Sequence, residues 1–238
     1  MTQRNGSWIT RRSFLKGAAG VGGGIAAASF AGALGVSAAE GGDDIQTMLN
    51  LAATAETLAV THYYSVITAR SFDLELADEA YLKFALDAEQ THLDFLNANG
   101  AKALADKFFV PATLLSDKAV FVSVTDQAET AFVGAYLAAT RRFADLGNPR
   151  LAATAAQVAC VEAQHLALAR EIGGLVPNDI TLALPVFFNV SDAVPVLAPF
   201  LNGGSGFVGP VSYPGKDKVM AALGGIKSRA VPPFTSAY

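Results

Sequence analysis

The sequence of 238 residues has little cysteine and little charge, and no basic cluster beyond its first 38 positions. Its only cysteine, Cys160, excludes an internal disulfide framework and a zinc site built from several thiolates. Charged residues make up only 16% of the chain and hydrophobic residues 52%, whereas charged residues are roughly 25% of an ordinary soluble domain. This composition excludes an intrinsically disordered chain and suffices for one domain with a full hydrophobic core.

Positive charge is concentrated at the N-terminus. Residues 1–38 carry four of the 17 basic residues and no acidic residue, whereas all 21 acidic residues lie further along the chain. The part beyond residue 38 is therefore acidic overall. A chain without a basic cluster in its main part is not expected to bind nucleic acid or an anionic membrane surface.

The segment Thr10–Lys16 reads TRRSFLK and is followed by an apolar, Gly/Ala-rich stretch over residues 17–36. Small residues at 36–38 then offer a cleavage site, so that residues 1–38 resemble a twin-arginine signal peptide. The resemblance implies export of the folded chain by the twin-arginine translocase, and a periplasmic or extracytoplasmic location. A membrane anchor is the alternative. The many glycines and few large side chains of residues 17–36 argue against stable membrane insertion of this stretch, and we expect the signal to be cleaved.

From residue 43 to residue 172 the chain is rich in Ala, Leu and Glu and poor in Pro and Gly, which favours long helices. Breaks at 71–73, 99–116 and 147–149 divide it into four expected helices, roughly 43–70, 74–99, 116–146 and 149–172. Asp73 and Ser116 are the expected N-caps of the second and third helices, and Pro149 suits the start of the fourth. We therefore expect an all-α fold, a four-helix bundle over residues 43–172.

The bundle repeats internally with an offset of 73 residues. Ala55-Glu56-Thr57 recurs as Ala128-Glu129-Thr130, Tyr63 recurs as Tyr136, and the motif Glu89-x-x-His92 recurs as Glu162-x-x-His165. This indicates two related helical hairpins that face each other. Residues 173–238 hold eight of the ten prolines, so this C-terminal extension cannot form a fifth long helix. Its short apolar pieces at 194–201 and 217–223 are expected to pack over the bundle.

Six side chains of these repeats form a candidate site. Residues i and i+3 share a helix face, so each Glu-x-x-His motif points a carboxylate and an imidazole the same way. A further glutamate lies 33 residues before the glutamate of each motif, and folding each hairpin at its turn brings these two glutamates level. The resulting set is Glu56, Glu89, His92, Glu129, Glu162 and His165.

The apolar sequence around Glu162 indicates that these acids face the core, where unpaired carboxylates are expensive to bury. Two divalent cations would balance four carboxylates. Ligands that are mainly oxygen, with two imidazoles, suit iron or manganese better than structural zinc. The sequence therefore predicts a two-metal centre.

This pattern resembles the ferritin-like superfamily of carboxylate-bridged two-metal proteins, and within it the exported ferritin-like domain proteins related to desiccation-related proteins. The resemblance implies Glu56 and Glu129 as terminal ligands, Glu89 and Glu162 as bridges, and one of His92 and His165 on each metal. It also implies that residues 100–116 form a long crossover along the bundle.

Four further residues lie near these six in the sequence. Tyr63 and Tyr136 follow the terminal glutamates by seven residues, two helical turns, and are either core aromatics or hydroxyls that orient a bridging carboxylate or donate an electron. His62 is expected to miss the centre and lie at the periphery. Cys160 is expected to be a buried small hydrophobe.

Three functions remain open at this point. The first is a di-iron oxidoreductase of ferroxidase or peroxidase type, acting on O2 or peroxide in oxidative or desiccation stress. The second is a di-manganese enzyme resembling catalase, with the same ligands. The third is a bundle that binds metal only structurally and acts through a partner or as a homo-oligomer. A cage-forming iron store is disfavoured, because the long extension has no place in a minimal ferritin subunit.

Overall fold

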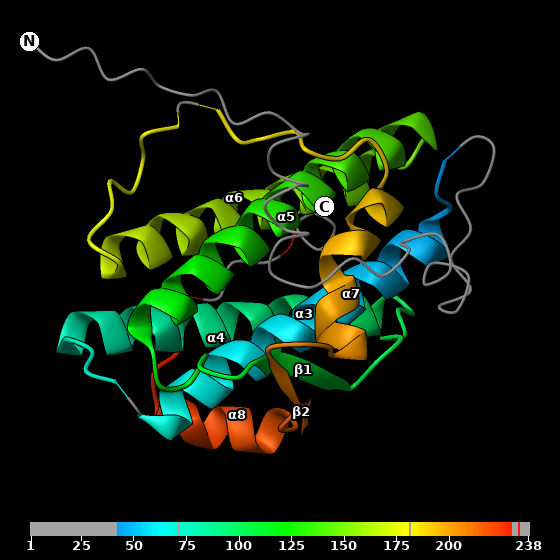
Figure 1. The fold of residues 1–238 in the computed structure, drawn as a ribbon. Coiled ribbons are helices and arrows are strands. Elements are labelled where there is room, and N and C mark those ends of the chain that lie inside the picture. Colours follow the sequence, from blue (N-terminus) through cyan, green and yellow to red (C-terminus); the bar gives the residue numbers. More distant parts are fainter. Residues whose placement is uncertain (1–41, 71, 181, 230–232, 234–238) are drawn as a thin grey trace, which may run out of the picture.

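The structure is a computed structural model, which describes residues 42–70, 72–180, 182–229 and 233 (Figure 1). The twin-arginine signal expected at residues 1–38 lies outside the described residues. Four long helices form the body of the described part: α3 (Ile45–Ala69), α4 (Leu76–Ala98), α5 (Lys118–Asp145) and α6 (Pro149–Ile172). Each begins and ends within two residues of its expected bounds.

The helix starts show which polar side chains act as caps. The side chain of Asp44 accepts a hydrogen bond from the Thr47 amide, and that of Asn148 accepts one from the Leu151 amide ahead of Pro149. The expected caps Asp73 and Ser116 are wrong. Glu75 precedes α4 without a side-chain cap, and Asp117 caps α5 because the backbone at Ser116 is still part of a turn closed on Thr113.

The helices pack as two antiparallel pairs, α3 with α4 and α5 with α6, and Figure 1 shows these pairs as two layers. The crossover between the pairs follows α3 along its length. The Gly100 carbonyl accepts a hydrogen bond from Gln46, and the Leu104 amide donates to Thr54, two turns further along α3. Helix α5 therefore starts beside the end of α3 and runs antiparallel to it, so that the two pairs face each other across the core.

A small sheet is the feature that the expected all-α fold does not include. The crossover strand β1 (Lys107–Pro111) pairs antiparallel with β2 (Phe207–Ser212) of the C-terminal extension, with an irregularity between Phe108 and Val110. Phe108 is fully buried in a cluster with Leu58 of α3. The sheet therefore ties the extension to the crossover.

The other described helices of the extension pack on the outside of the bundle. The short helix η1 (Val190–Ala193) contacts α3 and α5 and leads into α7 (Val194–Asn202), while α8 (Lys216–Leu223) packs on α4 and α3 (Figure 1). The extension lies close against α5 at Gly134, where an added Cβ would be 2.3 Å from Val186 Cγ2 of the extension. The extension is thus integral to the packed structure.

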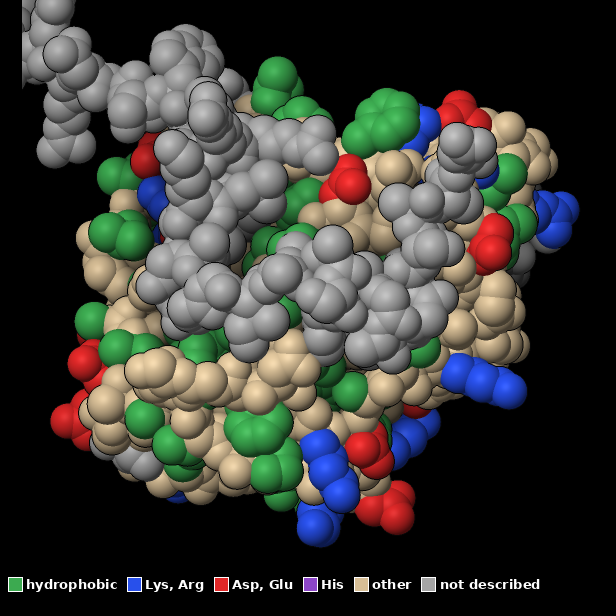
Figure 2. Space-filling view, turned by 45° about the vertical axis from the view of Figure 1, so that its right-hand side comes forward, with side chains coloured by type: hydrophobic (Ala, Val, Ile, Leu, Met, Phe, Trp, Pro, Cys, Tyr) green, Lys and Arg blue, Asp and Glu red, His purple; other side chains and the backbone are tan. Residues whose placement is uncertain are grey.

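On the face drawn in Figure 2, basic and acidic side chains are interspersed among hydrophobic and neutral surface. No helix in the described part of the chain combines the length and the hydropathy that crossing a membrane would require.

Candidate metal centre

The structure brings the six predicted site residues together in the middle of the bundle. Each long helix contributes from its buried face, and the glutamates are almost completely buried. Their ligand atoms form two overlapping groups, in each of which the atoms lie within 4.8 Å of one another. The groups are Glu56, Glu89, His92 and Glu162, and Glu89, Glu129, Glu162 and His165.

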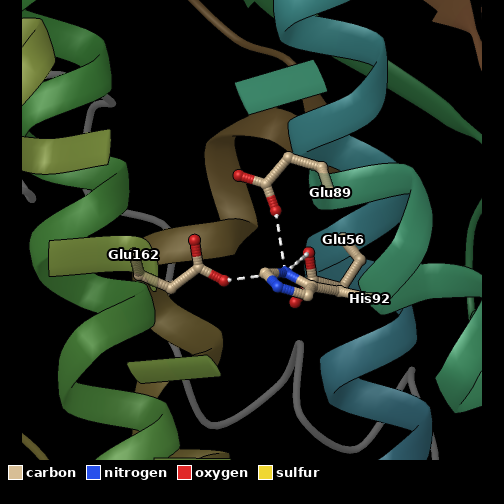
Figure 3. Close-up of side chains that lie close together, drawn as sticks. All are labelled: Glu56, Glu89, His92 and Glu162. Carbon is tan, nitrogen blue, oxygen red and sulfur yellow. Dashed lines mark ion pairs between the residues drawn. The ribbon is translucent and has the colours of Figure 1, made fainter. Parts of the chain in front are cut away.

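In the first group, drawn in Figure 3, three carboxylates surround one imidazole. His92 Nδ1 lies 3.6 Å from Glu56 Oε2, 3.4 Å from Glu89 Oε2 and 3.3 Å from Glu162 Oε1. These distances are longer than a good hydrogen bond between nitrogen and oxygen. The four ligand atoms therefore face a common centre, and the imidazole nitrogen is not hydrogen-bonded to any of the three carboxylates.

The second group has an equivalent imidazole on the other side, but this one lies within hydrogen-bond distance of two carboxylates and pairs with Glu162. His165 Nδ1 lies 2.9 Å from Glu89 Oε1, 3.1 Å from Glu162 Oε2 and 4.0 Å from Glu129 Oε1. Glu89 and Glu162 therefore each direct one oxygen at His92 and the other at His165. Glu56 and Glu129 each approach only one histidine.

Several of these atoms have no hydrogen-bond partner among the described residues. They include both oxygens of Glu89, one oxygen of each other glutamate and His92 Nδ1. Buried polar atoms are nearly always satisfied in proteins. Unpaired atoms that converge from four helices into two such groups are what bound cations would satisfy.

The charges of the cluster respond strongly to burial. Burial, together with the nearby charges of Glu89 and Glu162, raises the pKa of Glu56 and of Glu129 well above the ordinary value. Burial alone would also raise the pKa of Glu89, but His165 and His92 outweigh it and lower that pKa. Burial alone would lower the pKa of His92 and of His165, but the glutamates outweigh it and raise both, so the cluster favours positive charge among its carboxylates.

The donor set fits two metal ions. Ligand atoms bound to one ion at about 2.1 Å lie about 3.0–3.4 Å apart, close to most of the separations around each histidine. Two divalent ions would also balance the four carboxylates, and a set of mainly oxygen donors with two imidazoles suits iron or manganese. Glu89 and Glu162, which occur in both groups, have the arrangement of bridging ligands.

The two tyrosines bond crosswise between the helix pairs. Tyr63 of α3 donates a hydrogen bond to Glu129 of α5, and Tyr136 of α5 donates one to Glu56 of α3. Burial, with the charge of the bonded glutamate, raises the pKa of both tyrosines well above the ordinary value, so they remain protonated donors. They contact Glu129 and Glu56, and not the bridging pair that the sequence had suggested.

Two residues differ from expectation. His62 is outside both ligand groups, as expected, but it is buried and not peripheral, with Nε2 2.9 Å from Thr125 Oγ1. Cys160 is exposed and not buried. It lies two residues before Glu162, which places it about 200° around the helix, on the face opposite the buried glutamate.

Sequence reasoning missed Thr154, a buried threonine on α6 whose hydroxyl has no hydrogen-bond partner among the described residues. It lies eight residues before Glu162, about two turns along the helix and about 80° around it. That spacing was the available signal, but it does not distinguish a site residue from an ordinary core threonine.

The model of the ferritin-like domain family matches residues 43–174, more than half of the chain. No curated protein and no solved structure gives a match. The matched residues comprise the four long helices and all six residues of the buried Glu/His cluster. The chain therefore belongs to the ferritin-like domain family.

Proposed function

We propose that this ferritin-like protein binds two iron ions in the Glu/His cluster and acts as an oxidoreductase of ferroxidase or peroxidase type. The observation that carries the proposal is that Glu89 and Glu162 each present one oxygen to each histidine. Two bound iron ions would supply two electrons, one from each of two adjacent positions, for the reduction of O2 or peroxide. Glu56 and His92 would complete one position, and Glu129 and His165 the other.

The protein's own residues perform three tasks in this proposal. The carboxylates neutralise the cations, and burial keeps bulk water away from the centre, which strengthens the electrostatic interactions. Tyr63 and Tyr136 hold Glu129 and Glu56 in place through hydrogen bonds and keep a protonated hydroxyl beside each position. Because each bond joins opposite helix pairs, the tyrosines also fix the separation of the two halves of the site.

We further propose that the chain is loaded with metal and folded before the twin-arginine translocase exports it. The sequence of residues 10–38 supports this part of the proposal. Function outside the cytoplasmic membrane, in protection from oxidative or desiccation stress, would follow.

The test is the dependence of stability on metal in wild type and in Glu162→Gln. Wild type should bind two ferrous ions and gain about 2.7 kcal/mol for each site when free metal is 100 times the Kd. Glu162→Gln should lose most of that gain, because its bridging carboxylate contributes to both positions. Without metal, the variant should be as stable as wild type or more stable, since the charge of Glu162, which opposes the ionisation of Glu56 and Glu129, is removed. Anaerobic thermal melting with and without ferrous ion, together with metal quantification, checks this.

Glu171→Gln is the matched control, because it makes the same change at an exposed position of the same helix. It should retain two metal ions and the full stabilisation. Equal stabilisation of wild type and Glu162→Gln by metal would contradict the bridging role. Native exported protein with two manganese ions that evolves O2 from peroxide would favour the catalase-like alternative. Bound metal without O2 consumption or reaction with peroxide would favour the structural one.

A further inference from the structure

A cavity of about 50 Å³ lies inside the bundle next to the Glu/His cluster. All four long helices line it, at the end of the bundle where α3 and α6 begin. Its walls are apolar except at three residues, His92, Tyr136 and Thr154. We call it the inner cavity. His92 is a member of the first ligand group, and Tyr136 donates a hydrogen bond to Glu56 of that group. The inner cavity therefore ends at the candidate metal centre.

A second cavity of about 30 Å³, the outer cavity, lies between α3, α5 and the helices of the extension. The two cavities share wall residues, among them Ala52 and Ala55 of α3 and Ala135 of α5. Alanine side chains leave a gap here that larger residues would close. Val194 and Leu197 of α7 line the outer cavity from the side of the extension. The two cavities are thus neighbours across a wall in which alanine predominates, one beneath the extension and the other inside the bundle.

The inner cavity reaches only one of the two candidate metal positions. His92 and Tyr136 line the inner cavity, whereas His165 and Tyr63, their counterparts in the other half, line neither cavity. The side chain of His92 is 11% exposed and that of His165 only 5%. The two positions are therefore alike in ligands but different in access.

Thr154 is the polar group in the apolar wall away from the cluster. It is 4% exposed, and its hydroxyl has no hydrogen-bond partner among the described residues. Other buried threonines of the bundle behave differently. Thr57, Thr61 and Thr125 each donate to the carbonyl four residues earlier. Thr154 is therefore the one polar group of this wall, away from the cluster, whose hydroxyl is not used within the described part of the bundle.

We infer that the two cavities are a binding site for dioxygen, which reaches the metal position of Glu56 and His92 through the gap between α3 and α5. The inner cavity is much smaller than the engineered cavity of about 150 Å³ that admits benzene. Water or peroxide needs two to four polar partners in a buried site. Tyr136 already donates to Glu56 and His92 Nδ1 faces the carboxylates, so Thr154 supplies the one free hydroxyl of this wall. A small apolar gas fits both the size and the chemistry. Gas binding needs no metal, whereas delivery to the centre rests on the proposed function.

Xenon is the probe for the first arm of the test, because it enters dry apolar cavities. Crystals of the protein, with its metal as isolated, are placed under xenon pressure. Xenon should occupy the space bounded by Ala52, Ala135 and Thr154. Ala155→Leu, which fills the inner cavity from α6, should abolish that density. Ala156→Leu makes the same change one residue further, outside both cavities, and should retain it.

The second arm measures the O2 concentration at which the bound ferrous ions are oxidised at half the maximal rate. It should rise severalfold in Ala155→Leu with the metal content unchanged, and stay at the wild-type value in Ala156→Leu. Ordered water in the cavity of the wild type, or xenon only at the surface, would overturn gas binding whatever the metal does. Xenon binding with an unaltered O2 dependence in Ala155→Leu would overturn delivery by this route. Loss of metal from all proteins, with xenon still bound, would instead count against the proposed function.

Discussion

His62 is a buried histidine beside the candidate metal centre that takes no part in it. Its ring stacks on Phe121 with the ring centroids 5.4 Å apart. The hydroxyl of Thr125 donates to the Phe121 carbonyl, so its oxygen is free to accept a hydrogen bond from His62 Nε2–H. This assigns a neutral imidazole with the proton on Nε2. Burial lowers the pKa of His62 to about 4.

This depressed pKa predicts a specific loss of stability in acid. The unfolded chain protonates His62 below about pH 6.5, whereas the folded protein resists protonation down to about pH 4. The contribution of His62 is thus fully present above pH 6.5 and is lost as the pH falls toward 4. Between pH 7 and pH 4.5 the free energy of unfolding should fall by about 2–3 kcal/mol more in wild type than in His62→Gln. Urea unfolding at the two pH values, with a chelator in both samples, measures the difference. An equal fall in both proteins would show that His62 is not held neutral.

At the scale of residues, the sequence predicted the members of the Glu/His cluster because their placement depends on local rules. The spacing of Glu89 and His92 on one helix, and the matched distance from Glu56 across one turn, need no knowledge of distant contacts. The crosswise bonds of Tyr63 and Tyr136 do depend on how the two helix pairs face each other. The same holds for the unpaired hydroxyl of Thr154, which no single-helix pattern reveals.

Among the structural elements, α5 depends on a glycine where the extension crosses it. Gly134 is buried in the middle of the helix, where glycine is otherwise unfavourable by roughly 0.5–1 kcal/mol relative to alanine. The close approach of Val186 explains it, because a Cβ at residue 134 would collide with a methyl group of that side chain.

This collision predicts that the effect of Gly134→Ala on the free energy of unfolding changes sign when Val186 is replaced by a smaller residue. Gly134→Ala alone should destabilise the protein by about 1–3 kcal/mol through overpacking. In a Val186→Ala background the 2.3 Å collision is removed, and the contact that remains with Phe187, at 3.2 Å, requires a shift of only a few tenths of an ångström. The same change should then stabilise the protein by up to about 0.5–1 kcal/mol through helix propensity. Denaturant unfolding of the four proteins of this cycle gives both values. A destabilising effect in both backgrounds would mean that Val186 is not what requires glycine.

The long helices were predicted to within two residues because hydrophobic composition and breaks at Gly and Pro act locally. The strand pair was not predicted. Residues 107–111 and 207–212 form it from distant parts of the chain, and the second segment contains Gly209 and Pro210, which disfavour a strand on propensity alone. Only the burial of the crossover on α3, with the extension alongside it, makes the pairing favourable.

For the whole molecule, the export proposal predicts where the protein is found and what it lacks. The only tryptophan is Trp8, within the expected signal, so protein recovered from outside the cytoplasm should show no tryptophan fluorescence. Changing both Arg11 and Arg12 to Lys should leave the chain in the cytoplasm, whereas Arg4→Lys, outside the motif, should not. Cell fractionation with mass measurement checks both. Full-length chain, with Trp8, found in the periplasm would exclude cleavage.

The crosswise bonds of the tyrosines have a consequence for the ancestry of the centre. Exchanging the two helix pairs maps Tyr63 onto Tyr136, Glu129 onto Glu56 and His92 onto His165, so the ligands obey an approximate twofold axis. Two separate copies of one hairpin, meeting about such an axis, would be compelled to have identical metal positions. A single polypeptide that contains both hairpins is free of that constraint. It can keep the Glu/His residues of the two halves equal while the inner cavity adjoins one half alone, so two metals bound as proposed would be free to acquire different tasks.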